Sequence, residues 1–360
     1  MKKIGILTFH DAHNYGAMLQ CYALQRFLQL EGHQVEVIDY RPPFYQDQYK
    51  RHKIFPYIGK NPWRTIRSLY YNVMMYNKRC NAFAKFHQQY IKLSAPLVNN
   101  EIPSDYDVYI IGSDQVWNPT LTEGFHSVFF CDFNFKKDSK LYVSYAPSME
   151  NHSFSKEEIY YLQNALKRFD IISVRESSMI PLLQSLTTKK IHTVLDPTLL
   201  VGQEIWDGIR DECFIDKPYV ILYQIRESLQ VRQRAKEIAS RIGGEVVELT
   251  ARIDKNYPIR YQTASPADFI NLFRYASYVI TTSFHGTAFS LIFNRPFYTY
   301  KLGDSFDSRS ASLLTSVGLE GRMVSLEDNI SLNEIDFADA NKKISELRQF
   351  SRNFLIDALS

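Results

Sequence analysis

Acidic residues are absent from two long stretches of this 360-residue sequence. Residues 48–100 contain no Asp or Glu, although ten Lys or Arg residues occur there. Residues 269–303 also lack acidic side chains, and their basic residues are Arg274, Arg295 and Lys301. The second absence favours an anionic ligand over a metal ion in that region, because carboxylates bind hard metal ions whereas arginine attracts anions.

Cysteine is scarce, and long apolar runs are missing. The four cysteines are widely separated and show no CxxC or zinc-ligand spacing, which is typical of reduced thiols in a cytoplasm. No apolar run is long enough to span a membrane, and residues 4–9 are too few for the apolar region of a signal peptide. We therefore expect a cytoplasmic protein.

The overall composition is that of a globular protein. Hydrophobic residues make up 45% of the chain and charged residues 22%, and the length predicts two domains or one large one. The first loop, residues 10–17, lacks the GxGxxG pattern of dinucleotide-binding proteins, so we expect no dinucleotide cofactor.

Strand-like and helix-like segments alternate, which predicts an α/β fold with parallel sheets. The first unit is a strand at 4–9, an amphipathic helix at 19–30 that Gly32 ends, and a strand at 35–40. Further predicted strands are 107–111, 141–146, 171–174, 191–195, 219–225, 245–249, 278–282 and 297–300. Further predicted helices are 64–91, 155–169, 228–242, 266–275, 287–293, 309–317 and 334–359.

The stretch 278–297 combines a strand, a short turn and a helix. Ser283 to Gly286 separate the strand from the helix, and Pro296 ends the helix. Helix N-termini that follow parallel strands attract anions, and the pKa of histidine suits proton transfer near neutral pH. Two interpretations of His285 remain open here, a general acid or base and a residue that caps the helix or bonds within a loop.

Other polar clusters also follow predicted strands. Asp114 follows strand 107–111, and it either orients a ligand or forms an Asx turn. In the first loop, His10, Asp11 and His13 admit a metal site, loop packing or contact with a polar ligand.

The basic tract, residues 48–100, has three open interpretations. It forms an inserted helical segment with a solvated basic face, or it docks on anionic lipid headgroups or a lipid-linked diphosphate acceptor. Nucleic-acid binding is the third, but the sequence contains no nucleic-acid-binding motif, and we expect no nucleic-acid partner.

Seven motifs, in this order and spacing, resemble the polysaccharide pyruvyl transferase family. They are HNYG at 13–16, GSDQVWN at 112–118, YAPS at 145–148, ISVRE at 172–176, LDPTLL at 195–200, SFHGT at 283–287 and RSASLL at 309–314. Together they span most of the chain, and the basic tract lies outside them.

The resemblance implies two Rossmann-like domains in a GT-B-like arrangement, with the site in the cleft between them. We place the N-terminal domain at 1–201, with a basic, aromatic helical insertion at about 41–105, and the C-terminal domain at 202–330. Terminal helices at 331–360 are expected to pack back on the N-terminal domain.

The resemblance also implies a bacterial transferase of exopolysaccharide biosynthesis. Such an enzyme moves the enolpyruvyl group of phosphoenolpyruvate onto two sugar hydroxyls of a polysaccharide, or of its lipid-linked precursor, and forms a pyruvate ketal. Phosphoenolpyruvate is then the donor substrate, no cofactor is needed, and peripheral contact with the inner membrane is expected.

The resemblance assigns Arg175 and His285 to the donor site. With the positions of the motifs, it predicts His285 and Asp114 as catalytic residues. The predicted donor-binding residues are Arg175, Ser283, Gly286, Thr287, Arg295 and Arg309. The predicted acceptor or cleft residues are His13, Asn14, Tyr15, Ser113, Gln115 and Trp117.

One position departs from the family pattern. Several branches have arginine two residues before the histidine, where this chain has Ser283, so another arginine must hold the donor. Two alternative functions remain open: a nucleotide-sugar glycosyltransferase of the same fold, and a non-catalytic protein that docks on glycans or membranes.

Overall fold

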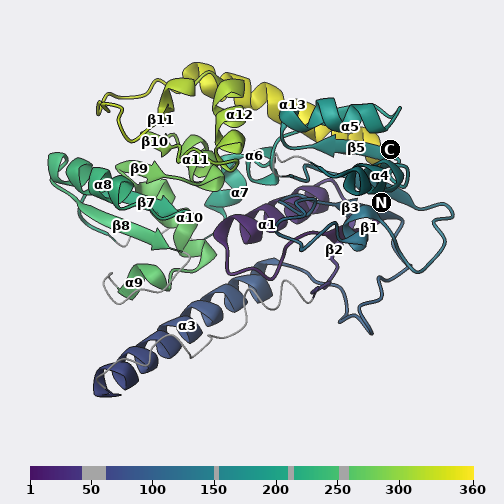
Figure 1. Ribbon diagram of the computed structural model, residues 1–360, viewed down its shortest axis with the longest axis horizontal. Coiled ribbons are helices and arrows are strands. Elements are labelled where there is room, and N and C mark those ends of the chain that lie inside the picture. Colours follow the sequence, from purple (N-terminus) through teal and green to yellow (C-terminus); the bar gives the residue numbers. More distant parts are fainter. Residues whose placement is uncertain (43–61, 150–153, 210–214, 251–258) are drawn as a thin grey trace.

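The computed structural model describes residues 1–42, 62–149, 154–209, 215–250 and 259–360. It contains two parallel sheets (Figure 1). The first has the order β2-β1-β3-β4-β5-β6, and the second has the order β11-β10-β9-β7-β8. The predicted α/β class with two Rossmann-like domains is confirmed by these sheets.

The strands of the first sheet are β1 (Lys3–Leu7), β2 (Gln34–Val37), β3 (Val108–Ile111), β4 (Leu141–Ser144), β5 (Ile171–Val174) and β6 (Ile191–Thr193). Those of the second are β7 (Tyr219–Gln224), β8 (Glu245–Thr250), β9 (Tyr278–Thr281), β10 (Phe297–Tyr300) and β11 (Met323–Val324). The boundary at 201 and the limits of the three predicted parts stay a prediction, although the two sets of strands lie on either side of it.

The α-helices of the N-terminal half are α1 (Tyr15–Leu30), α3 (Pro62–Tyr90), α4 (Lys156–Leu166), α5 (Ile180–Leu186) and α6 (Pro197–Leu200). Those that follow are α7 (Gln203–Asp207), α8 (Leu229–Arg241), α9 (Ile259–Gln262), α10 (Pro266–Tyr275), α11 (Phe284–Ile292), α12 (Asp307–Val317) and α13 (Ala338–Leu359).

Two helices begin three or more residues earlier than predicted, and both bound the site. Asn14 caps α1 by accepting hydrogen bonds from the N–H groups of Gly16 and Ala17, so α1 starts at Tyr15 and not at residue 19. Helix α11 starts at Phe284, which places His285 inside its first turn and not in a loop before it. The predicted interruption at 283–286 is therefore wrong in its extent.

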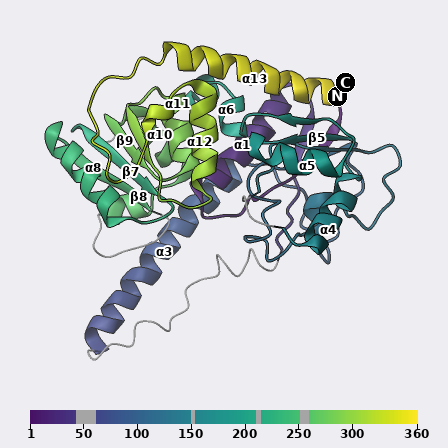
Figure 2. The same ribbon diagram turned by 45° about the horizontal axis from the view of Figure 1, so that its top comes forward.

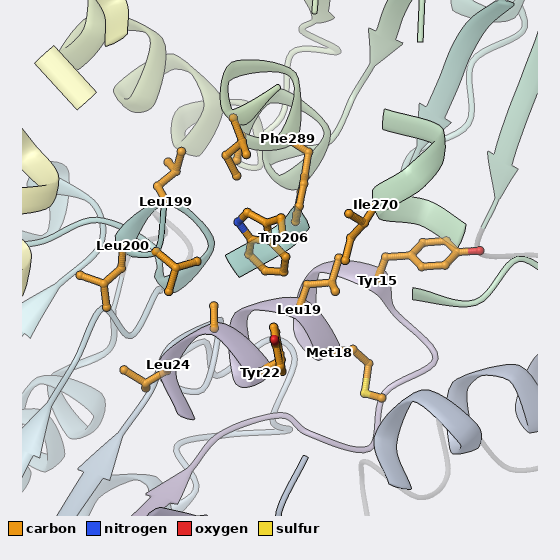
Figure 3. Packing of buried hydrophobic residues seen from close by; sticks show 14 of the residues in the cluster. Tyr15, Met18, Leu19, Tyr22, Leu24, Leu199, Leu200, Trp206, Ile270 and Phe289 are labelled. Carbon is orange, nitrogen blue, oxygen red and sulfur yellow. The ribbon is translucent and has the colours of Figure 1, made fainter. Parts of the chain in front are cut away.

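One apolar core joins the two sheets. Figure 3 shows Trp206 of α7 among side chains of α1, α6, α10 and α11, including Leu19, Leu199, Ile270 and Phe289. Burial of about 25 cal/mol per Å² of apolar surface makes such a shared core the main attachment between the domains. The carboxyl ends of β1, β3, β7 and β9 thus face each other across a fixed interface.

Helix α13 returns from the second domain to the first. Ser351 Oγ accepts a hydrogen bond from the backbone N–H of Leu195, which follows β6 in the first domain, at 2.9 Å. Arg348 Nε donates to the Leu199 carbonyl at 2.8 Å, and the Lys2 ammonium donates to the Ser360 carbonyl at 3.0 Å. The two chain ends are therefore neighbours (Figures 1 and 2).

The basic tract contributes α3, which projects from the body of the molecule in both views (Figures 1 and 2). Residues 43–61 of the predicted insertion lie outside the described residues. No helix within the described ranges has the length and apolar content needed to cross a bilayer.

Candidate active site

A cleft of about 230 Å³ lies between the two domains at the carboxyl ends of their strands. Its first-domain lining is Phe9, Ala12, Asn14, Ala17, Asp114, Gln115 and Leu121. Its second-domain lining is Ile225, Arg226, Ser283, Phe284, His285, Phe306 and Arg309. The cleft thus brings together side chains that lie up to 300 residues apart in the sequence.

The imidazole of His285 is wedged between the two domains. A Cβ atom on Gly16 of α1 would lie 2.0 Å from its Nδ1, so the ring rests directly on that glycine. Its Nε2 lies 3.8 Å from Oδ2 of Asp196, too far for a hydrogen bond. Among the described residues, the buried Nε2 has no hydrogen-bond partner.

Burial lowers the pKa of His285 below the ordinary histidine value. The carboxylates of Asp196 and Asp114 oppose this shift, while the positive charges of Arg175 and Arg309 add to it. This shift favours the neutral imidazole, and a bound anion would raise the pKa of His285.

Arg175 already has two carboxylate partners. Its Nε lies 2.8 Å from Oε1 of Glu176, and its Nη1 lies 2.9 Å from Oδ2 of Asp196. Burial acts to lower the pKa of Arg175, but the two carboxylates outweigh it and raise the pKa. The guanidinium also lies 4.6 Å from the centre of the Phe284 ring.

Asp196 is the carboxylate that lies between Arg175 and His285. Burial acts to raise its pKa, but His285, Arg175 and hydrogen bonds from Thr198 hold the pKa below its usual range. The backbone N–H and the hydroxyl of Thr198 donate to Oδ1 at 2.9 and 2.7 Å. Asp196 is therefore an ionised, fixed carboxylate beside the imidazole.

Arg309 is the exception among the arginines of the cleft. It is 8% exposed and, in the part of the chain that the structure describes, has neither an ion pair nor a hydrogen bond. Its guanidinium lies 5.2 Å from the centre of the Phe306 ring. Burial, with the nearby charge of Arg175, lowers the pKa of Arg309 to about 10. A buried cation without a partner favours the binding of an anion.

Arg226 follows β7 and lines the same cleft. It pairs with Asp304, and its Nη2 lies 2.8 Å from Oδ1 of Asp307 and 3.0 Å from the carbonyl of Thr282. Sequence reasoning missed Arg226, although its position directly after a predicted strand was the same signal that pointed to Asp114 and Arg175. Asp304 and Asp307 are consequently engaged by protein and not free for a ligand.

A family model for polysaccharide pyruvyl transferase matches residues 14–301. The chain belongs to this family. Membership makes the protein a transferase, and four of the seven motifs contribute side chains to the cleft, those at 13–16, 112–118, 283–287 and 309–314. No curated protein matches the sequence.

Solved structures resemble this pyruvyl transferase family member only distantly. A UDP-N-acetylglucosamine 2-epimerase from Rickettsia bellii is 10% identical, with 99% of this chain and 96% of that chain covered and a TM-score of 0.46. The glycosyltransferase SnogD from Streptomyces nogalater is also 10% identical, with 98% and 95% covered and a TM-score of 0.43. These are likenesses in fold alone.

Several predicted site residues of this family member do line the cleft. Asn14, Asp114, Gln115, Ser283, His285 and Arg309 are among its lining residues. Asp114 has a left-handed backbone with φ of 70°, and its Oδ1 accepts a hydrogen bond from the N–H of Gln115 at 2.9 Å. It forms a local turn and faces the cleft as well, so the two interpretations are compatible.

The N-terminus of α11 offers N–H groups to the cleft, because no side chain caps it. Gly286 and Thr287, in the first turn of α11, also have structural roles. A Cβ at Gly286 would lie 2.1 Å from Oγ1 of Thr281, and the Thr287 hydroxyl donates to the Ser283 carbonyl at 3.1 Å. Their predicted contribution to donor binding stays a prediction that concerns the backbone of Gly286 and not the Thr287 side chain.

Arg295 follows the C-terminal end of α11, whereas His285 lies in the first turn of that helix. The helix ends at Ile292, about 10 Å beyond His285 at 1.5 Å per residue. Arg175 lines a separate cavity of about 520 Å³ that shares Phe284 and Arg309 with the cleft. Donor binding by these two arginines stays a prediction: neither lines the cleft, and Glu176 and Asp196 hold Arg175.

Four predicted acceptor residues also lie outside the cleft lining. Trp117 is fully buried and donates to the Phe129 carbonyl at 2.9 Å, because the strand-end loop folds inward there. Ser113 is buried and donates to the Ala146 carbonyl at 2.9 Å.

Tyr15 donates across the domain interface to the Ala264 carbonyl at 3.0 Å and stacks on Phe269. His13 lines another cavity, where its Nδ1 lies 3.8 Å from Sγ of Cys80. Nearby, His10 pairs with Asp39 and Asp11 pairs with Arg41, so these side chains point to different partners. No group of three potential metal ligands occurs within the described ranges.

Proposed function

We propose that the protein transfers the enolpyruvyl group of phosphoenolpyruvate to two hydroxyls of one sugar in a glycan and forms a pyruvate ketal. The observation that carries this proposal is the unpaired, buried Arg309 beside the neutral His285 in a small interdomain cleft. An anionic donor supplies the missing counter-charge, and an imidazole supplies the proton that the reaction needs.

The size of the cleft supports a small donor. Pockets for drug-sized ligands enclose roughly 300–1,000 Å³, whereas this cleft encloses about 230 Å³. A nucleotide sugar is larger than that, and glycosyltransferases of this fold often hold its ribose with an acidic residue of the second domain. The nearby second-domain carboxylates, Asp304 and Asp307, are occupied by Arg226. The alternative of a nucleotide-sugar glycosyltransferase is therefore less well supported.

In the proposed mechanism, Arg309 and the N-terminus of α11 bind the carboxylate and phosphate of the donor. The bound negative charge raises the pKa of His285, which then gives a proton to the methylene carbon and makes C2 electrophilic. A sugar hydroxyl attacks C2 and loses its proton to Asp114, which belongs to the opposite domain.

Attack by the second hydroxyl closes the ketal ring and expels phosphate from C2. One of the two hydroxyl protons replaces the proton that His285 delivered to the new methyl group, and the other leaves with phosphate. Asp196 keeps the imidazole oriented through its charge, and Arg175 keeps Asp196 in place. We propose an oligosaccharide or lipid-linked glycan as acceptor, and transfer in the cytoplasm, where such donors are made.

The test is turnover by purified protein with phosphoenolpyruvate and a panel of glycans. We expect acceptor-dependent release of phosphate and a new ketal methyl resonance in the proton NMR spectrum of the glycan. His285→Ala should remove most of this turnover and leave the circular dichroism spectrum unchanged. Near-normal turnover by this variant would contradict the assignment, and absence of donor turnover with every acceptor would favour a non-catalytic role.

A further inference from the structure

The first half of α3 presents apolar side chains to solvent. Ile66, Tyr70, Val73 and Met74 are 57%, 69%, 40% and 43% exposed. Their spacing of four, seven and eight residues from Ile66 places them on one face of the helix. A contiguous exposed apolar face on a charged protein marks an interaction surface.

The second half of α3 is anchored in the protein. Met75, Phe83 and Phe86 are buried, and Arg79 donates to carbonyls of the second domain. Ile66 lies thirteen residues before Arg79, about 20 Å along the helix. The first half of α3 therefore projects from the body of the molecule (Figures 1 and 2).

Charge complementarity decides between partners for this face. Helix α3 contains five Lys or Arg residues and no acidic residue, and its Lys78 and Lys85 are exposed. A second copy of the chain would bring two such basic helices together, which is repulsive. A nucleic acid would match the charge but leave Ile66, Val73 and Met74 without apolar contacts. An anionic lipid surface satisfies both features.

We propose that α3 is a docking helix for anionic membranes. Tyr70 lies at the level of the headgroups, the neighbouring aliphatic side chains enter the acyl boundary, and the basic side chains meet lipid phosphates. This places the cleft near a membrane surface, where a lipid-linked glycan would be presented. The docking itself does not depend on the proposed transferase reaction.

Vesicle sedimentation of the full chain tests the proposal. We expect binding to vesicles that contain phosphatidylglycerol, weaker binding as salt increases, and no binding to pure phosphatidylcholine. Tyr70→Glu with Val73→Glu should lower the affinity at least tenfold. The matched control is Tyr160→Glu on α4, because Tyr160 is also 69% exposed, and this variant should bind like the wild type.

Four results would overturn the proposal. They are wild-type protein that ignores anionic vesicles, equal binding to both lipids, a double variant that retains binding, and equal loss in the Tyr160→Glu control. Analytical ultracentrifugation of the same proteins adds a fifth. If the wild type is a dimer that the double variant converts to a monomer, a second copy covers the face and the lipid assignment is wrong.

Discussion

At the scale of single residues, Arg175, Arg226 and Arg309 around the cleft differ in whether a carboxylate balances their charge. Arg175 and Arg226 each have two carboxylate partners, whereas the described residues provide none for Arg309. The sequence pointed to Arg175 and Arg309 as donor-binding candidates and missed Arg226. It did not show which of them lacks a counter-charge, because ion pairing depends on carboxylates that come from distant segments.

Arg309→Gln should therefore weaken phosphoenolpyruvate binding about 10- to 100-fold, because a hydrogen bond to a charged group contributes about 1.5–3 kcal/mol. The same variant should raise the free energy of unfolding by on the order of 2 kcal/mol, since it removes a buried, uncompensated cation. Calorimetric titration and urea unfolding measure the two effects. Arg295→Gln is the control, and donor affinity should not change in it.

Donor binding should be coupled to proton uptake. In the free protein, burial lowers the pKa of His285, so the ring is neutral, and the bound anion raises that pKa. The complex then holds more protons than the free protein, so affinity rises as pH falls through the histidine range, by at most about tenfold per pH unit. Titration calorimetry at several pH values measures this.

Phosphoenolpyruvate itself also changes charge in this pH range, so the comparison with His285→Gln isolates the contribution of the protein. The variant should show a flatter dependence of affinity on pH than the wild type. Identical pH dependence in both proteins would show that His285 does not take up the proton.

Between elements, the contact of α1 with α11 positions the imidazole. Gly16→Ala would place a Cβ 2.0 Å from Nδ1 of His285 and force the ring to move. Because a displacement of about 1 Å costs up to 100-fold in rate, we expect kcat to fall by about that factor with the fold retained. Steady-state kinetics measures kcat, and circular dichroism shows whether the fold is retained.

Gly208→Ala is the matched control, because its added Cβ would meet its nearest neighbour at an ordinary 3.5 Å. Unchanged kcat in Gly16→Ala would mean that the position of the His285 ring is unimportant for the reaction.

The sequence did not reveal the contact between Gly16 and His285. It indicated that both helices follow strands, but it did not place the start of either helix, since Asn14 caps α1 through its side chain and α11 begins at a Phe-His-Gly run of low helix propensity.

Across the whole molecule, Arg79 of α3 fastens the two domains together. Its Nη1 donates to Tyr15 Oη of the first domain at 3.2 Å and to the carbonyls of Thr250 and Gln262 of the second domain, both at 2.9 Å. Nothing in the sequence distinguished Arg79 from the other basic residues of its tract, because its burial arises only when both domains are assembled around α3.

Arg79→Met should lower the free energy of unfolding by about 3 kcal/mol or more, because each buried carbonyl left without a donor costs about 1–3 kcal/mol. Lys78→Met, at the exposed neighbouring position, should be nearly neutral. Equilibrium unfolding in urea measures both. Equal stability of the two variants would show that Arg79 does not fasten the domains.

The larger architecture was predictable where local patterns decide it. Alternating strands and helices indicated parallel sheets, and strand-end polar residues indicated a shared edge, so Asp114 and His285 were placed in one site. Local patterns did not predict which motif residues are buried and which line the cleft. Trp117 and Tyr15 belong to motifs beside the cleft, yet they serve packing and the domain interface.

The most direct test of the central claim is thermal unfolding of wild type, Arg309→Gln and Arg295→Gln with phosphoenolpyruvate or with nucleotide sugars. A ligand at about 100 times its dissociation constant stabilises the folded state by about 2.7 kcal/mol, which raises the midpoint measurably. We predict a rise with phosphoenolpyruvate alone, present in Arg295→Gln and lost in Arg309→Gln. A rise with a nucleotide sugar alone, or one with phosphoenolpyruvate that persists in Arg309→Gln, would contradict the account.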